Sequence, residues 1–317
     1  MKTFSLVNLF PFLLTIIASR MATLVVLIGP SKGFGKALLR NCLENPNITR
    51  LGNRTVFILV TTNRDATANT WNELYEEMRG VRFSDDLDCG IDVLIEETDL
   101  SNTNKCLAIC EVLRISLGHL HSLIERLYLF LNSGSVTPVG PLIVPNDQKD
   151  PLYVPDDTFM MQVQSHCILN FISTSTITRL LLNLILGRKP SSEVLEIRIV
   201  NVSSLAAIHE IYGLAVYGAI KAARDSFIRS LAMEVARVFP SVDCKFLSYA
   251  PGLMATEVVD RDLLMVSSPP NEIRDSPQKF VDPYVSAKRC ISLIVDKSFS
   301  WTNGAHIDFY DEIKYDT

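Results

Sequence analysis

The 317-residue sequence lacks the features that point to nucleic acids, metals or a disulfide scaffold. It has no basic block, and 30 Lys and Arg against 35 Asp and Glu give a formal net charge of -5, so no broad basic surface for nucleic acid is expected. Its seven cysteines are odd in number and include no Cys-x-x-Cys pair, which argues against a disulfide framework and a zinc knuckle. We therefore expect reduced thiols and no metal site, with Cys106 and Cys110 contributing to helix packing.

The sequence also lacks the low hydrophobicity of a disordered chain and any repeat of fixed period. Its 48% hydrophobic and 21% charged content is ordinary for a globular protein with a large core. The length allows about two domains at ~150 residues each. Since no linker separates two independently patterned halves, we predict one domain over residues 21–317.

Residues 1–20 form an apolar leader that differs from the rest of the chain. The run is interrupted by Asn8, Pro11 and Thr15, and it is short for a membrane span, which needs about 20 mainly apolar residues. Two interpretations stay open: a secretory signal peptide, or an upstream extension with translation beginning at Met21. The cysteine usage favours the cytoplasm, and we expect no membrane association for the mature domain.

Short β-branched and apolar runs alternate with longer stretches of helical period. This pattern is typical of an α/β fold: a Rossmann-like, doubly wound parallel sheet of about seven strands with helices on both faces. The predicted strands are Thr23–Ile28, Thr55–Val60, Asp92–Ile95, Leu127–Leu131, Ile197–Val202, Cys244–Ser248 and Ala305–Phe309.

One long helix is predicted between the fifth and sixth strands. Ile228, Leu231, Val235 and Val238 recur at steps of three and four and would form one buried stripe, and Pro240 ends the segment.

Two segments are predicted to be loops. They cover residues 140–157, which contain four prolines, and residues 267–283. Ligands of open α/β sheets bind outside the carboxyl ends of the strands, so both loops are candidates for substrate loops.

A glycine turn follows the first predicted strand and opens a helix. Glycines permit unusual backbone angles, allow a pyrophosphate to approach the main chain, and direct the helix N-terminus at the anion. The context of strand, turn and helix therefore indicates a dinucleotide site rather than an ordinary tight turn. The residues expected to bind the cofactor phosphates are Gly29, Ser31, Lys32, Gly33, Phe34 and Gly35.

The end of the second strand distinguishes the two nicotinamide cofactors. An NAD site usually places an acidic residue there, whereas here Arg64 precedes Asp65. Arg64, together with Lys32, could hold a 2′-phosphate, so we predict NADPH; Asp65 leaves NADH as the less favoured alternative.

A second constellation suits proton transfer. Tyr217 and Lys221 are four residues apart, which places both on one helix face, where the ammonium group can favour ionisation of the phenol. An unperturbed tyrosine has a pKa of about 10, so such a neighbour would bring it towards a useful range. Ser204 closes the fifth strand, where its hydroxyl can bind a substrate carbonyl; Ser203 is the weaker alternative.

Taken together, the glycine turn, the serine and Tyr-x-x-x-Lys resemble the short-chain dehydrogenase/reductase family. The resemblance extends from Met21 to about Asp311. Five motifs together are similar to those of pterin-reducing members, and the last is the most specific, because most members of the larger family lack it. The matching segments are Gly33-Phe-Gly35, Asn201-Val-Ser-Ser204-Leu205, Lys221-Ala-Ala-Arg-Asp225, Tyr249-Ala-Pro-Gly252 and Gly304-Ala-His-Ile-Asp308-Phe-Tyr-Asp311.

The resemblance implies a role for each reacting residue. Tyr217 would donate the proton, Lys221 would bind the nicotinamide ribose and tune the tyrosine, and Ser204 would hold the carbonyl. Asn170 would fix a water in the proton relay. Asp308 would anchor the pterin, since a carboxylate can accept paired hydrogen bonds from the pterin edge.

The resemblance also implies further contacts with the cofactor and substrate. Asp99 and Leu100 match the pair that contacts the adenine, and Gly134 matches the turn after the fourth strand. The loop over the nicotinamide would contain Gly252, Met254 and Thr256, with Gly252 also facing the substrate.

Several positions depart from the family pattern. Ile28 replaces the usual Thr, Pro30 stiffens the glycine turn, Leu131-Asn132-Ser133-Gly134 replaces Asn-Asn-Ala-Gly, and Arg64 lies one place later than the usual basic residue. These positions support the site rather than react.

The sequence thus predicts an NADPH-dependent carbonyl reductase for the side-chain ketone of a pterin. A reductase for other small dicarbonyls is the alternative within the class, and a non-catalytic dinucleotide sensor is the alternative outside it. The resemblance further implies a homodimer, for which Ile228, Leu231 and Val235 could form either the interface or core packing.

Overall fold

A computed structural model of the chain describes residues 22–50, 53–82, 90–118, 124–143, 155–187, 195–254 and 280–313. The leader at 1–20, Thr256 and most of the two predicted substrate loops lie outside the described residues.

A parallel sheet of seven strands forms the centre of the molecule, as the sequence predicts, in the order β3-β2-β1-β4-β5-β6-β7. The bounds are β1 Ala22–Ile28, β2 Arg54–Thr61, β3 Ile91–Glu97, β4 Ile124–Leu131, β5 Glu196–Val202, β6 Asp243–Ala250 and β7 His306–Asp308.

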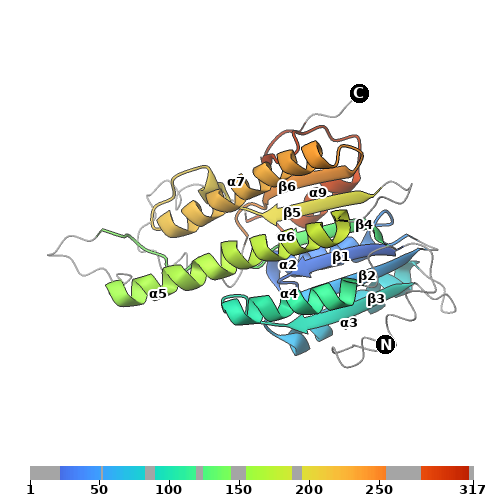
Figure 1. Cartoon of the computed structure of the whole chain (residues 1–317), viewed down its shortest axis with the longest axis horizontal. Helices are drawn as coiled ribbons and strands as arrows, with labels where there is room; N and C mark the ends of the chain where they lie inside the picture. The colour runs from blue at the N-terminus through green and yellow to red at the C-terminus, as the bar shows by residue number, and fades with distance from the viewer. Residues whose placement is uncertain are drawn as a thin grey trace.

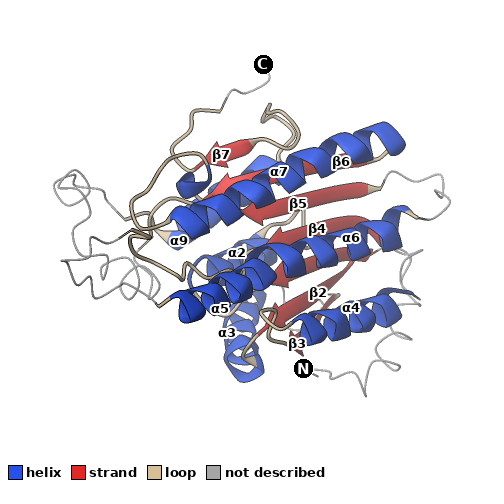
Figure 2. Cartoon of the chain, turned by 60° about the vertical axis from the view of Figure 1, so that its left-hand side comes forward, coloured by secondary structure: helices blue, strands red, loops and turns tan. Residues whose placement is uncertain are grey.

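Helices cover both faces of the sheet (Figures 1 and 2). One face carries α4 Thr103–Gly118, α5 Asp156–Cys167, α6 Ser173–Leu186 and α7 Ala215–Val238. The other carries α2 Gly33–Glu44, α3 Arg64–Arg82 and α9 Pro283–Val295. Each layer encloses its own hydrophobic cluster, because the inner strands alternate side chains towards the two faces.

The predicted packing of α4 is confirmed, and the predicted buried stripe of α7 is confirmed in part. Cys106 and Cys110 are buried in α4, as predicted. The predicted stripe on α7 is correct for Ile228 and Val235, but Val238 is 65% exposed. It is the last residue of α7.

The stretch Asp156–Leu186 is long and apolar enough to pass a length-and-composition test for a membrane span, but 44% of its most apolar window is buried inside the protein. A core helix of a soluble protein passes the same test, so this stretch is weak evidence for a membrane segment.

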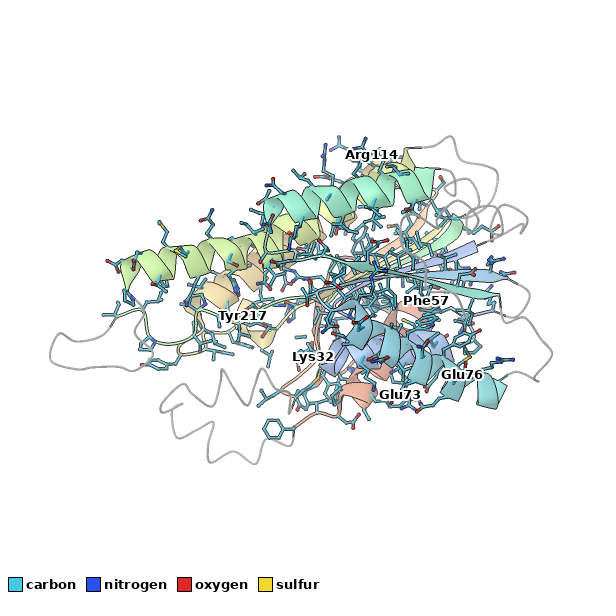
Figure 3. The ribbon with its side chains drawn as sticks, turned by 90° about the horizontal axis from the view of Figure 1, so that it is seen from below. Lys32, Phe57, Glu73, Glu76, Arg114 and Tyr217 are labelled. Atoms are coloured by element: carbon cyan, nitrogen blue, oxygen red, sulfur yellow. The ribbon has the colours of Figure 1, made fainter. Side chains whose placement is uncertain are left out.

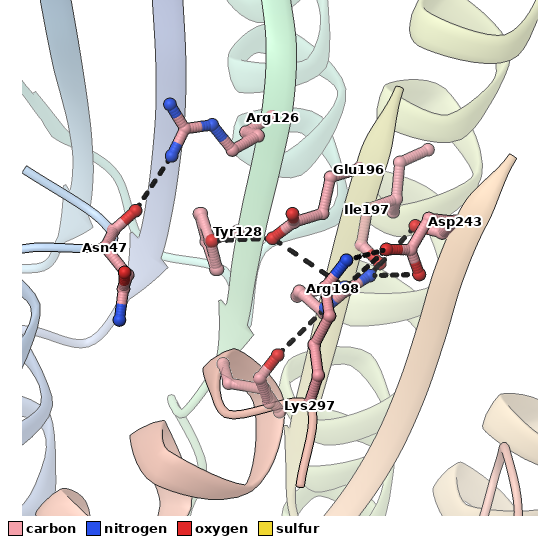
Figure 4. Close-up of polar contacts among 9 residues, drawn as sticks. Asn47, Arg126, Tyr128, Glu196, Ile197, Arg198, Asp243 and Lys297 are labelled. Carbon is pink, nitrogen blue, oxygen red and sulfur yellow. Dashed lines mark hydrogen bonds and ion pairs between the residues drawn. The ribbon is translucent and has the colours of Figure 1, made fainter. Parts of the chain in front are cut away.

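The amino-terminal edge of the sheet holds a polar network away from the predicted site (Figure 4). Arg198, only 2% exposed, makes two hydrogen bonds of 3.0 and 2.9 Å to the carboxylate of Asp243. Glu196 accepts a 2.7 Å hydrogen bond from the Tyr128 hydroxyl and lies 3.8 Å from Arg198. This network joins β4, β5 and β6.

Replacing Asp243 with Asn should destabilise the fold by about 2–3 kcal/mol, because the buried Arg198 loses the nearer of its two charged partners. Burial raises the pKa of Asp243, but the hydrogen bonds and charge of Arg198 outweigh it and hold the pKa below its ordinary value. The stabilisation is therefore present at neutral pH and is lost as the pH falls through that lowered pKa. Urea unfolding should show a gap between the two proteins at pH 7 that closes in acid; a gap independent of pH would contradict this account.

Candidate active site

The order of the strands locates the site. The chain runs outward from β1 to β2 and β3, then returns to place β4 on the other side of β1. This reversal leaves a switch point between β1 and β4, outside whose carboxyl ends ligands of such sheets bind. The two ends are tied together there, since Asn132 Nδ2 donates a 2.7 Å hydrogen bond to the carbonyl oxygen of Gly29.

The glycine turn after β1 is packed too closely for side chains. Gly29 has φ +78°, and Gly33 has φ +53°, in the left-handed region that favours glycine. A Cβ on Gly35 would lie 1.9 Å from the carbonyl oxygen of Gly29. The glycines in this turn are therefore required by the backbone, and the buried Phe34 stacks on Tyr249 at 6.1 Å between ring centroids.

The helix end that follows suits an anion. Lys32 is the N-cap residue of α2, its side chain makes no capping hydrogen bond, and the first turn contains no acidic residue. By contrast, Asp282 caps α9 through the amides of Tyr284 and Val285. An uncapped N-terminus beside a glycine turn fits the pyrophosphate of a dinucleotide.

Three further predicted cofactor residues follow the carboxyl ends of β2 and β3. Arg64 begins α3 directly after β2. Asp99 follows β3 and accepts hydrogen bonds from the hydroxyl and amide of Ser101, which lower its pKa against the effect of burial. Leu100 is buried and its carbonyl accepts a 2.6 Å hydrogen bond from Ser173.

The turn after β4 and the segment after β6 are also crowded. A Cβ on Gly134 would lie 2.5 Å from Asn170 Oδ1 and 3.8 Å from Lys221 Nζ. Gly252 has φ +81°, and its Cβ would lie 2.7 Å from Val281 Cγ2. Met254 is buried.

The structure brings Tyr217 and Lys221 together in the first turns of α7, at the same end of the sheet as Lys32 (Figure 3). Lys221 Nζ lies 5.5 Å from the centre of the Tyr217 ring and donates a 2.6 Å hydrogen bond to the carbonyl of Val202. Ser204 follows β5 and caps the short helix Leu205–Ala207, and its side chain is close enough to the Tyr217 hydroxyl to lower the pKa of that phenol. Three residues from two segments therefore meet at one point.

The pKa of Tyr217 shifts in the opposite direction to the one that the sequence predicts. Burial raises the pKa of Tyr217 above its ordinary value, while the hydrogen bond with Ser204 and the charge of Arg224 act against this rise. The prediction that Lys221 lowers this pKa is wrong for the structure as it stands, because the ammonium group is directed at Val202 and the phenol is desolvated. Burial also holds the pKa of Lys221 well below its usual value, and Asp225 opposes that fall.

Asn170 lies inside a π-helical turn, Ile168–Ile172, which joins α5 to α6. It is fully buried, and its side-chain oxygen accepts a 3.3 Å hydrogen bond from the amide of Ser135. Irregular turns of this kind occur frequently at functional sites. The side chain lies beside Gly134 and hence near Lys221.

His166, which the sequence analysis missed, lies one helical turn before Asn170. It is 2% exposed, and its ring meets the edge of Tyr217 at 6.1 Å between centroids. Burial, with the charge of Lys221, lowers the pKa of His166 to about 4, so the imidazole is neutral at physiological pH. In the sequence, a single histidine in a helical segment gives no indication that its ring lies against Tyr217.

A buried network connects α7 to β7. Asp225 accepts a 2.8 Å hydrogen bond from Asn201 Nδ2, and its second oxygen lies 2.7 Å from His306 Nδ1. The spacing of Asp225 from Lys221 predicts that both residues lie on one helix face. The contact of Asp225 with His306 joins residues 81 positions apart and could not be predicted from the sequence.

Asp308 ends β7 with one carboxylate oxygen unsatisfied. It is 5% exposed, and Oδ1 accepts a 2.9 Å hydrogen bond from the amide of Tyr310. Its Oδ2 is buried without a hydrogen-bond partner within the described part of the chain. Such an oxygen carries a desolvation cost of about 1–3 kcal/mol until something donates to it. In the same part of the chain, no group of three or more His, Cys, Asp or Glu could hold a metal ion.

The comparisons with known proteins agree with this geometry. A sequence model of the short chain dehydrogenases matches residues 152–264. The L-sorbose reductase of Gluconobacter frateurii, solved with NADPH and L-sorbose, shares the fold with a TM-score of 0.64 at 17% identity, over 92% of this chain and 95% of that one. The chain belongs to the short-chain dehydrogenase/reductase family and is thus an oxidoreductase that uses a nicotinamide dinucleotide.

Within that family, the chain is similar to sepiapterin reductases over nearly its whole length. It is 32% identical to "Sepiapterin reductase" of Bos taurus over 303 residues, which cover 92% of this chain and 95% of that protein. The protein of the same name from Xenopus laevis is 30% identical over 295 residues, covering 92% and 96%.

Proposed function

We propose that the protein is an NADPH-dependent reductase of the side-chain ketone of a pterin, such as sepiapterin or 6-pyruvoyl-tetrahydropterin, in tetrahydrobiopterin synthesis. The observation that carries the pterin assignment is the buried, unsatisfied Oδ2 of Asp308. The chain's similarity to sepiapterin reductases supports it.

The glycine turn, the N-terminus of α2 and Arg64 would hold NADPH, and Lys221 would bind its nicotinamide ribose. The bound cofactor supplies the hydride. Asp65, the residue that left NADH open, is exposed on the first turn of α3, and the solved relatives in complex with NADPH support the phosphorylated cofactor.

The protein's own residues would position the ketone and supply its proton. Ser204 would donate a hydrogen bond to the carbonyl oxygen, and Tyr217 would transfer its hydroxyl proton to that oxygen as negative charge develops. Arg224, whose charge lowers the pKa of Tyr217, would stabilise the phenolate that remains. Asn170 would hold a water that returns a proton from solvent.

Asp308→Asn should separate pterins from other carbonyl substrates. The variant keeps an oxygen for the Tyr310 amide but replaces the second acceptor with an NH2 donor, which cannot accept from the pterin edge. We expect kcat/KM for sepiapterin to fall about 10- to 100-fold, while a small diketone is reduced as before.

Steady-state assays on both substrates measure this ratio, and Glu312→Gln, an exposed acid four residues further on, provides the matched control. Equal losses on both substrates would favour the alternative, a reductase for other small dicarbonyls. The homodimer and the cytoplasmic location stay predictions.

A further inference from the structure

Two carboxylates surround Arg64, the residue proposed to bind the 2′-phosphate. Glu96 and Glu97 end β3 and pair in register with Val60 and Thr61 at the end of β2. Arg64 Nη2 lies 3.8 Å from Glu96 Oε2, and the backbone amide of Arg64 donates a 3.0 Å hydrogen bond to Glu97 Oε2. Both contacts join segments about thirty residues apart, which the sequence alone did not reveal.

Each carboxylate contacts a group of Arg64 that would also attract a phosphate. The guanidinium group of Arg64 is the cation expected to bind it, and the amide of Arg64 belongs to the N-terminus of α3, where anions are favoured. The ribose that carries the 2′-phosphate binds at the end of the second strand in this fold. A phosphate at that position would therefore meet two negative charges as well as its cation.

Because Glu96 is buried, its pairing with Arg64 should oppose the binding of NADPH more than the binding of NADH. The side chain of Glu96 is 7% exposed, and its Oε1 has no hydrogen-bond partner among the described residues. Burial raises the pKa of Glu96, and the charge of Arg64 counteracts this rise. If Arg64 turned to a phosphate, Glu96 would lose charge compensation. A cofactor with a 2′-hydroxyl would leave the pair intact and could donate to a carboxylate.

We propose that Glu96 and Glu97 determine how strongly the protein discriminates between NADPH and NADH, by competing with the 2′-phosphate for Arg64 and the N-terminus of α3. Their presence weakens the preference for the phosphorylated cofactor and lets the protein accept NADH as well. This inference rests on the proposed cofactor site, but not on the identity of the carbonyl substrate.

Binding of the reduced cofactors to the full chain, followed by nicotinamide fluorescence, tests the proposal without turnover. Glu97→Gln and Glu96→Gln each remove one charge and keep a hydrogen-bond acceptor. We expect each to tighten NADPH binding about three- to tenfold, with less effect at high salt, and to leave NADH binding within about twofold. Competition by 2′,5′-ADP against ADP should show the same change.

Glu76→Gln is the matched control, because Glu76 is exposed on the same helix (Figure 3). By helix geometry it lies about 18 Å from Arg64 along the helix axis. It should alter neither cofactor. Arg64→Gln should weaken NADPH alone. If that variant leaves the NADPH-to-NADH ratio unchanged, the proposed cofactor site is wrong. If Arg64→Gln behaves as expected but the two glutamate variants leave the ratio unchanged, or weaken both cofactors alike, the competition is overturned and the cofactor site stands.

Discussion

Tyr217→Phe should lower kcat for carbonyl reduction by about 10²- to 10⁴-fold, the range for loss of a positioned proton donor. The substitution removes a single oxygen. It keeps the ring that meets His166 edge-on and lies 5.5 Å from Lys221 Nζ, so the packing of α7 should persist. The loss should therefore fall on the chemical step and not on the fold.

Single-turnover reduction measured by cofactor absorbance gives the rate, and cofactor binding and thermal melting provide the controls. We expect NADPH affinity to change less than about twofold, because in the proposed site the hydroxyl would contact the substrate carbonyl and not the cofactor. A variant that retained most of its rate would remove Tyr217 from the reaction. If the unaltered protein bound NADPH tightly but oxidised none, the sensor alternative would gain support.

Gly35→Ala should abolish measurable NADPH binding and lower the free energy of unfolding by about 1–3 kcal/mol. The added Cβ would lie 1.9 Å from the Gly29 carbonyl oxygen and 2.6 Å from Asn132 Nδ2. The backbone of Gly29 cannot move away without breaking its bonds to Val60 and Asn132. The turn proposed to bind the cofactor phosphates must therefore open.

Gly80→Ala is the natural control for this change. Gly80 lies on α3, and a Cβ there meets nothing within 4 Å, so the same methyl group should stabilise the helix by about 0.5–1 kcal/mol. Urea unfolding and NADPH titration of both variants give the comparison. Normal cofactor binding by Gly35→Ala would show that the turn does not hold the pyrophosphate.

The fold was predictable because its signal is local. Each inner strand is a run of β-branched and apolar residues, and every predicted strand is present within a few residues of its expected bounds. The largest error at a strand start is in β4, which begins at Ile124 rather than Leu127. Arg126 interrupted the apolar pattern, yet it is 7% exposed and bonds the carbonyl oxygen of Asn47.

The positions of the proposed reacting residues were predictable for a similar reason. Tyr217 and Lys221 share a helix face by their spacing, and a strand end places Ser204 at the same edge of the sheet. Contacts between distant segments produce no such spacing pattern in the sequence. Asn132 was considered a departure from the family pattern, whereas the structure shows its amide holding the Gly29 turn. Glu96 and Glu97 were overlooked, since only the pairing of β2 with β3 brings them to Arg64.

The bond between Asp225 and His306 has a consequence for which molecules can react. Asp308 lies two residues after His306 on a short strand, and Tyr217 lies two helical turns before Asp225, so one buried contact couples the two ends of the proposed substrate. If Asp308 and Tyr217 hold the two ends of the substrate as proposed, the protein scaffold and not the ligand sets the distance from the pterin ring to the ketone. Analogues with side chains one carbon longer or shorter would present the wrong atom to the phenol, however well their rings bind.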